Sequence, residues 1–429
     1  MEVSRSERSP TRVLLVTTTA YPVVKAGTEV YVHHLASELQ QFGFEPIVLT
    51  LSALDTSNDL GYAIRSVASR EDLLNEIHRT GARIVHFHSI DNAGFSLDDV
   101  IAVKHAGFLV VATFHLANNT CVSGDLWQFR KQLCTGKMDA RVCTTCYLER
   151  KTGSLSLAGA ITRLQRLTVG VFANKSILIP GMSLAKINRH QALVFQALAS
   201  LDHIICIAKW YESVLLANEI DATKISLIPQ LKPENSAGTL PRTAFKKLVF
   251  VGRLVAEKGI HELLSAWRNS NTENLQLTLV GPCTDDSIRS SLEALVQLSG
   301  NVVYKGEMDH AMVLDELLNH DVLVLGSHAE MAPLVVSESL ARGLAIIGAD
   351  APGILEMCQK GLHRIYPRGN HRQLSELFNA LNQSLPVFQP AKLPFDHIDR
   401  IQLAQHHAAV YSGLIQSSIS NLRDVSLKR

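Results

Sequence analysis

The sequence lacks the features that would place the chain across a membrane or on a nucleic acid. No apolar run approaches the roughly 18 residues that a membrane-spanning helix needs. The 41 lysine and arginine residues are nearly balanced by 40 aspartate and glutamate residues, and there is no basic arm, so we expect no nucleic-acid partner. The polar start, MEVSRSERSPTR, has neither the hydrophobic segment nor the cleavage site of a signal peptide. We therefore expect a cytoplasmic protein, at most peripheral at the inner face of a membrane.

Cysteine is scarce, with seven residues in the chain, and a cytoplasmic setting favours metal binding or reduced thiols over disulfides. Four of the seven follow the spacing Cys-x12-Cys-x8-Cys-x2-Cys, at Cys121, Cys134, Cys143 and Cys146. Such a set suits a structural, tetrahedral zinc ion; an iron–sulfur cluster and four unrelated thiols are the alternatives. The remaining cysteines lie in core-like segments, where we expect them to act as small apolar fillers.

The chain is longer than the roughly 250 to 300 residues at which single cores stop growing, which predicts two domains. Apolar runs of strand length alternate with helical periodicity in both halves, a pattern typical of parallel βαβ units. The sequence therefore predicts an α/β protein with two Rossmann-like, doubly wound sheets. The expected strands are 12–17, 46–51, 84–88, 108–113 and 203–207 in the first half, and 247–252, 276–280, 302–304, 321–325 and 344–348 in the second.

The domain boundaries follow from composition. Residues 1–232 are predicted to form an N-terminal domain that includes the cysteine cluster, and 243–394 a C-terminal domain. The segment 233–242 is rich in Pro, Gly, Ser and Asn and is predicted to be the linker. The helical pattern in 395–429 is expected to cross back to the N-terminal domain.

Two strand-to-helix turns of the second half carry candidate chemistry, because open α/β sheets bind ligands beyond the carboxyl ends of their strands. In VGRLVAEKGI, Arg253 and Lys258 lie at the tip of the turn, a pairing suited to a diphosphate; two solvated charges are the alternative. In GSHAEMAPLVVSESLARGL, Glu330 falls in the turn and Glu338 in the helix, where both can accept hydrogen bonds from sugar hydroxyls. A buried structural acid and a loop charge are the alternative. Pro333 is predicted at the first position of this helix, whose free N–H groups can bind an anion.

A third turn follows the first strand, where AGTE leads into a helix. Gly27 allows close approach of a ligand to the backbone at this helix start, although a structural glycine is the alternative. The dinucleotide fingerprint GxGxxG is absent from this turn.

Taken in order, VGRLVAEKGI, HAEMAPLVVSE, AGTE and GADAPGILE resemble the motifs of retaining glycosyltransferases of family 4. The resemblance spans about residues 12–414 and implies the GT-B fold, in which two Rossmann-like domains face a central cleft. It implies a hexosyltransferase that moves a sugar from a UDP- or GDP-linked donor to a polysaccharide, glycolipid or other saccharide or lipid-linked acceptor. It also implies retention of anomeric configuration without a catalytic divalent metal. The alternatives are another GT-B enzyme, such as a nucleotide-sugar epimerase, and a non-catalytic nucleotide-sugar-binding subunit.

The resemblance implies a role for each matching residue. Arg253 and Lys258 hold the donor diphosphate, Glu338 holds the ribose, and Glu330 holds hydroxyls of the donor sugar. Gly27 lines the cleft from the other domain, and His115 lies near the donor sugar, although a histidine at a strand end can also be structural. The backbone of the turn closes around the donor at Met331, Ala332, Pro333 and Leu334.

Three departures from the family pattern bear on the identity of the donor. Glu330 is followed by Met-Ala-Pro instead of Gly-Phe-Gly, and Pro333 removes a backbone donor. The segment ending the N-terminal domain reads Pro-Gln-Leu-Lys at 229–232, and Pro352 replaces the first glycine of the downstream pair.

The region 154–198 mixes Leu, Val and Ile with basic residues. An amphipathic basic surface of this kind can rest on anionic lipid, which would suit a lipid-linked acceptor. Ordinary solvated helix faces are the alternative. The basic residues are Arg163, Arg166, Lys175, Lys186 and Arg189.

Overall fold

The structure is a computed structural model that describes residues 10–24, 26–51, 60–69, 71–90, 94–117, 119–172, 183–231, 244–390 and 398–427. The predicted linker 233–242 and Lys175 lie outside the described residues. The chain divides into two compact units. The first unit comprises 1–122, 136–231 and 397–429, and the second comprises 123–135 and 232–396.

The first unit is built on a parallel sheet, seven-stranded as far as the structure describes the chain, in the order β3-β2-β1-β4-β5-β8-β9. Its central strands have almost continuous apolar sequences, as parallel strands covered on both faces require. Val13, Leu14, Leu15 and Val16 of β1 are wholly buried. The strands are β1 (Thr11–Thr17), β2 (Phe44–Thr50), β3 (Ala63–Ser66), β4 (Ile84–Phe87), β5 (Leu109–Phe114), β8 (His203–Cys206) and β9 (Ile225–Leu227).

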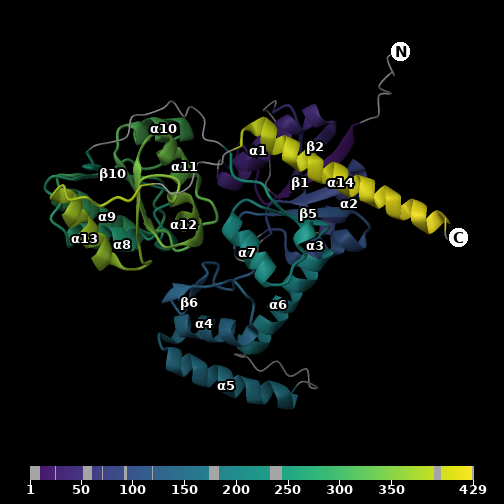
Figure 1. The fold of residues 1–429 in the computed structure, drawn as a ribbon, viewed down its shortest axis with the longest axis horizontal. Helices are drawn as coiled ribbons and strands as arrows, with labels where there is room; N and C mark the ends of the chain where they lie inside the picture. Colours follow the sequence, from purple (N-terminus) through teal and green to yellow (C-terminus); the bar gives the residue numbers. More distant parts are fainter. Residues whose placement is uncertain are drawn as a thin grey trace. The chain divides into compact units, whose positions relative to one another are not determined.

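The C-terminal helix α14 (Arg400–Leu427) belongs to this unit and packs against α1 (Gly27–Leu39), as Figure 1 shows. Two buried contacts join it to the rest of the unit. The Tyr411 hydroxyl lies 2.6 Å from His86 Nδ1, and the Tyr31 hydroxyl lies 3.3 Å from His407 Nε2. The other helices are α2 (Glu71–Thr80), α3 (Leu97–His105), α4 (Ala140–Thr152), α5 (Leu155–Phe172), α6 (Ser183–Ser200) and α7 (Lys209–Ala217).

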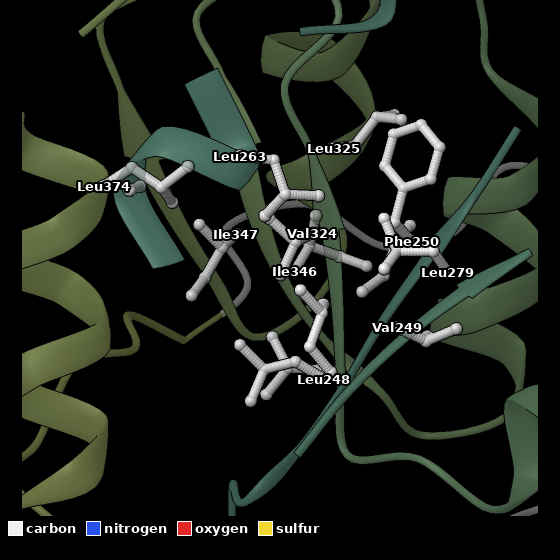
Figure 2. Packing of buried hydrophobic residues seen from close by; sticks show 14 of the residues in the cluster. Leu248, Val249, Phe250, Leu263, Leu279, Val324, Leu325, Ile346, Ile347 and Leu374 are labelled. Atoms are coloured by element: carbon white, nitrogen blue, oxygen red, sulfur yellow. The ribbon is translucent and has the colours of Figure 1, made fainter. Parts of the chain in front are cut away.

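The second unit is built on a parallel sheet with the order β12-β11-β10-β13-β14-β15, which has six strands within the described residues. Side chains of adjacent strands interdigitate in its core, as Figure 2 shows for Leu248, Phe250, Val324 and Ile346. The strands are β10 (Lys247–Val251), β11 (Gln276–Val280), β12 (Val302–Tyr304), β13 (Val322–Leu325), β14 (Ala345–Ala349) and β15 (His363–Tyr366).

Short polar contacts fix the ends of these elements. The Asp321 carboxylate accepts hydrogen bonds from the backbone N–H groups of Lys246 and Lys247, at 3.0 and 2.9 Å, and so ties the starts of β10 and β13. Asp285 caps α9 by accepting from the N–H groups of Ser287 and Ile288. The helices of the unit are α8 (Ile260–Arg268), α9 (Asp286–Leu298), α10 (His310–Leu318), α11 (Leu334–Ala341), α12 (Pro352–Cys358) and α13 (His371–Asn382).

A short hairpin is an unexpected part of the second unit. The chain leaves the first unit after Val122 and returns to it at Gly136. Between these points, β6 (Trp127–Gln128) pairs with β7 (Gln132–Leu133) in an antiparallel ladder. The sequence assigns this segment to the first domain, because the hairpin has no apolar period that distinguishes it from its surroundings.

The predicted fold class is confirmed: the protein is α/β, with two doubly wound parallel sheets. In each sheet the strand order reverses beside the first strand, at β1 and β4 and at β10 and β13. Ligands of open α/β sheets bind beyond such switch points. At the second switch point the turn after β10 touches the turn after β13, because a Cβ on Gly259 would collide with the Gly326 carbonyl.

Gly259 also has a φ of +71°, so alanine at this position faces both a left-handed backbone and a collision. We expect Gly259→Ala to lower the free energy of unfolding by more than the about 1 to 2 kcal/mol typical of left-handed backbone alone. Gly306→Ala, at the same φ but with open space around the Cβ, isolates the backbone cost. Gly300→Ala, where neither constraint applies, should leave stability unchanged. Urea unfolding of the three variants gives the comparison, and equal costs at 259 and 306 would contradict the close approach.

Candidate active site

The turn after β10 presents the two predicted cations. It contains a 3-10 turn at Ala256–Lys258, and Gly259 precedes α8 in a left-handed conformation. Leu254 is wholly buried and anchors the turn, whereas Arg253 is exposed. The guanidinium of Arg253 is therefore displayed at the carboxyl edge of the sheet, beside the switch point.

The turn after β13 brings Glu330 against this first turn. Lys258 Nζ lies 2.5 Å from Glu330 Oε1, and both side chains are largely buried. The N–H of His328 donates to the Glu257 carbonyl at 2.8 Å. Two residues 72 positions apart in the sequence thus form one charge pair at the switch point. The sequence indicated both residues but not their mutual contact.

The start of α11 differs in one detail from the sequence prediction. The helix begins at Leu334, and Pro333 is the residue before it, with extended backbone, because its ψ of 115° lies outside the helical range. Met331 is buried, and Glu330 accepts a hydrogen bond through its carbonyl from the N–H of Gly353 at 3.2 Å. The loop that joins Glu330 to the helix is therefore held by α12, and a side chain on Gly353 would collide with it.

Glu338 lies on α11 and is 8% exposed. Its carboxylate lies 2.7 Å from Nε2 of His310, the first residue of α10. The hydrogen bond with Glu338 raises the pKa of His310 and outweighs the opposing effect of burial. His310 is mostly exposed, so Glu338 is a buried acceptor with a solvent-accessible partner. The sequence gave no signal for His310, which matches no motif.

In the first unit, Gly27 is the first residue of α1 and is exposed, as a helix start open to a ligand requires. Glu29, two residues on, is buried and accepts a hydrogen bond from the Thr19 hydroxyl. His115 follows β5 directly and is half-buried. Its Nε2 lies 3.3 Å from Nδ1 of His88, which follows the neighbouring strand β4. Because both strands are parallel, the two imidazoles meet at the carboxyl edge of the sheet.

Four imidazoles, at His86, His88, His115 and His407, form what we call the histidine cluster. His88 and His115 are paired, His86 and His88 have ring centroids 4.0 Å apart, and His407 stacks on His86 at 5.6 Å. Burial, followed by the charge of His407, lowers the pKa of His115 to about 3. Burial likewise lowers the pKa of His407 to about 4. The cluster is therefore uncharged at neutral pH.

The structure does not support the predicted zinc site. Over the described part of the chain, which includes all four cysteines, no group of three or more His, Cys, Asp or Glu side chains is arranged to hold a metal ion. Cys134 belongs to the second unit, whereas Cys143 and Cys146 lie on α4 of the first. The other three cysteines are buried, as small apolar fillers would be, at Cys206, Cys283 and Cys358.

The basic region 154–198 forms parts of α5 and α6. Arg163, Arg166 and Arg189 are exposed, as both the lipid-contact and the solvated-face interpretations require. No helix in the described ranges is both long and apolar enough to cross a bilayer.

Several solved protein structures share the architecture of this chain, and they identify its fold. The chain resembles sucrose-phosphate synthase from Thermosynechococcus elongatus with a TM-score of 0.63 and 14% identity, covering 95% of this chain and all of that one. It resembles Anabaena HepE in complex with UDP and glucose with a TM-score of 0.57 and 12% identity, covering 94% and 100% of the two chains. WaaG, a glycosyltransferase involved in lipopolysaccharide biosynthesis, gives a TM-score of 0.57 and 14% identity, with 92% and 95% covered. The protein therefore has the GT-B glycosyltransferase fold.

The second unit identifies the family of its domain. Residues 232–384 match the family described as Glycosyl transferases group 1. A putative teichuronic acid biosynthesis glycosyltransferase of Bacillus subtilis, TuaC, is 34% identical over 128 residues, which are 30% of this chain and 31% of that protein. Glycogen synthase of Mycobacterium tuberculosis is 28% identical over 152 residues, 35% of this chain and 34% of the enzyme. The chain thus spans about a third of the length of the curated relatives that it matches.

The histidine cluster predicts a pH dependence of stability. A histidine with a lowered folded pKa stabilises the native state above its unfolded value of about 6.5, and this stability is lost as pH falls toward the folded pKa. We expect the free energy of unfolding to fall between pH 6.5 and 5, with each buried histidine contributing up to about 1.4 kcal/mol per pH unit. His407→Gln should reduce the dependence of the unfolding free energy on pH by up to the contribution of one buried histidine, about 1.4 kcal/mol per pH unit. Urea unfolding at pH 7.0, 6.0 and 5.0 measures the slope.

The control is His105→Gln, which removes an exposed histidine from α3 of the same unit. If His407→Gln and wild-type protein lose stability equally between pH 7.0 and 5.0, His407 is not the buried neutral group described above.

Proposed function

We propose that the protein is a retaining glycosyltransferase that moves a sugar from a UDP- or GDP-linked donor to a polysaccharide, glycolipid or other glycoconjugate acceptor. The observation that carries the proposal is the convergence of two turns at the switch point of the second sheet, where Lys258 pairs with Glu330. Arg253 is exposed on the first of these turns, and Glu338 lies on the helix that follows the second. This convergence lies within the domain that matches Glycosyl transferases group 1. The switch point is where open α/β sheets place their ligands.

The donor diphosphate is assigned to the cationic side of this site. Arg253 supplies a planar fork with several N–H donors, and Lys258 supplies an ammonium with three. One of the three faces Glu330, so the ammonium can bind a phosphate oxygen and keep its carboxylate partner. The N–H groups at the start of α11 add a partial positive charge. Together these groups stabilise the charge that develops on the leaving diphosphate, which is often the largest contribution to catalysis in a water-excluded site.

The two ends of the donor are assigned to the two carboxylates. Glu338 accepts hydrogen bonds from the ribose hydroxyls, and the exposed His310 moves aside to admit them. Glu330, fixed by Lys258 and by the Gly353 contact of its own carbonyl, accepts from hydroxyls of the sugar. Because their partners are hydroxyls and not the scissile bond, the carboxylates differ from the acid/base pair of a glycosidase. We assign no catalytic divalent metal, since the cationic side chains neutralise the diphosphate.

The backbone from Met331 to Leu334 is assigned to the sugar end as well, although Pro333 contributes no N–H. For Gly27 and His115 of the first unit we propose the roles that the family resemblance implies, at the cleft and near the donor sugar. A neutral His115 is suited to accept or donate a hydrogen bond without adding charge. If the acceptor is lipid-linked, the basic region 154–198 is proposed to contact the membrane surface. For a soluble acceptor we propose no membrane contact.

The test is incubation of the purified protein with a panel of UDP- and GDP-sugars, reading release of nucleoside diphosphate. We expect slow hydrolysis of one donor. Arg253→Ala should reduce the rate about 100- to 1000-fold, the usual cost of removing a group that stabilises developing charge. Glu338→Gln should raise KM for the donor, because an amide is a poorer acceptor for the ribose hydroxyls. The configuration of the released sugar, read by NMR at early times, distinguishes retention from inversion.

The matched control is Arg268→Ala, which removes an exposed arginine at the end of α8. It should leave the hydrolysis rate unchanged. If the protein hydrolyses no donor and no donor raises its melting temperature, the transferase proposal fails. The protein would then be better explained as a non-catalytic subunit. Conversion of one nucleotide sugar to another would identify an epimerase.

A further inference from the structure

The hairpin of residues 123–135 is held in an unusual shape. Leu126, Phe129 and Arg130 have positive φ values of 50°, 54° and 52°, which cost of order 1 kcal/mol or more each for residues other than glycine. Its ladder is short, with β6 and β7 of two residues each. A hairpin of this size is not independently stable. Contacts outside the hairpin must therefore hold it in place.

Arg368, which follows β15, provides these contacts. Its side chain has no exposed surface. Its Nη1 donates to the carbonyl of Asp125 at 2.7 Å, and its Nε to Asp350 Oδ1 at 3.0 Å. Nη1 also donates to the carbonyl of His328 at 2.8 Å. One buried guanidinium thus joins the hairpin, the end of β14 and the turn that carries Glu330.

The Trp127 indole packs against Arg368, His328 and Gly369, and we call this packing site the Trp127 seat. Arg368 lies 5.1 Å from the Trp127 ring, in cation–π contact, and the His328 ring lies 5.6 Å from it. Gly369 forms the floor of the seat. A Cβ on Gly369, which has a φ of +74°, would lie 3.0 Å from the edge of the indole. A side chain at this position would therefore be strained in its backbone and would crowd the indole ring.

The turn that carries Glu330 is held through His328 from three directions. The His328 carbonyl accepts from Arg368, its N–H donates to the Glu257 carbonyl at 2.8 Å, and its Nε2 lies 3.1 Å from Glu262 Oε1. Glu330 is two residues further along the chain. A displacement at Arg368 or in the hairpin is therefore passed by covalent geometry to the carboxylate of Glu330.

We propose that the hairpin and Arg368 form the positioning element of the donor-sugar end of the site. Arg368 acts as a positioning residue that holds the Glu330 turn through the His328 carbonyl, and Trp127 locks the guanidinium in that geometry. The element thereby determines which sugar the Glu330 turn accepts, without contributing to the hold on the nucleotide. The inference rests on the proposed function. It predicts that the affinity for the sugar part of the donor can change while the affinity for the nucleotide part does not.

The test compares affinities for UDP-glucose and GDP-mannose with those for UDP and GDP, by isothermal titration calorimetry. In Arg368→Lys the charge remains, but a point charge cannot make the several directed bonds of the guanidinium. We expect this variant to bind the nucleoside diphosphate within about twofold of wild type and the matching nucleotide sugar at least about tenfold more weakly. Trp127→Ala should give the same pattern, with Trp127→Phe intermediate. Selectivity between UDP-glucose and UDP-galactose should fall in the same order.

Arg268→Lys is the matched control for loss of a guanidinium and should alter neither affinity. Trp127→Phe keeps a ring in the seat, so it provides a folded variant if Arg368→Lys fails to fold. If a variant binds the nucleoside diphosphate and the nucleotide sugar equally more weakly than wild type, the inference is overturned, because a general structural defect has the same effect. Unchanged affinities in both Arg368→Lys and Trp127→Ala would also overturn it. If wild-type protein binds neither donor, the proposed function is what fails, and the inference fails with it.

Discussion

The contact of two backbones, at Gly259 and Gly326, is the constraint on which the rest of the second unit's site depends. The turns after β10 and β13 leave adjacent strands at the switch point, and they meet because Gly259 carries no side chain, while a side chain on Gly326 would also be crowded. The close approach brings the Lys258 ammonium to the Glu330 carboxylate, although a pair of opposite charges alone would not overcome the cost of ordering two long side chains. The glycines set the geometry, and the charges then stabilise it.

The same unit contains a buried carboxylate that is hydrogen-bonded to an exposed side chain, an arrangement that the proposed binding of a ribose would use. Glu338 is almost without exposed surface, and an unpaired carboxylate there would be costly. Its partner His310 is largely exposed at the start of α10, so an incoming hydroxyl can replace it without leaving a buried cation behind. Glu330, in contrast, is tied to a lysine on a neighbouring turn. Glu338 therefore has an exposed partner and Glu330 a largely buried one.

Much of this was visible in the sequence, for identifiable reasons. The buried strands of both sheets appear as apolar runs, and each predicted strand lies within about two residues of an observed one. The sequence did not predict three short edge strands, β3, β9 and β15. Their side chains are partly exposed, and each strand has only three or four residues. The site residues at the switch point were predicted from the turns that carry them, and the structure brings two of these residues, Lys258 and Glu330, into contact. His328 could have been noticed, since it lies two residues before Glu330 in the same turn.

Other features depend on distance in space and left no local pattern. Arg368 and Trp127 meet across 241 positions, counted from their numbers, and no periodicity links them. The histidine cluster draws one member from a helix some 290 residues beyond the others, counted likewise from His115 to His407. The cysteine spacing predicted a metal site that the structure does not support, and the chain enters and leaves the second unit between Cys121 and Cys143.

The hairpin has a consequence for how the second unit can be handled as a module. A gene fragment encoding only residues 232–396 would omit the strands β6 and β7 and leave the Arg368 guanidinium facing carbonyls that are no longer there. The unit is compact in space but is encoded in two pieces separated by nearly a hundred codons. Recombination at the linker between relatives would therefore exchange most of the unit while retaining the other parent's hairpin. Inheritance of the unit as a whole requires that both stretches stay together.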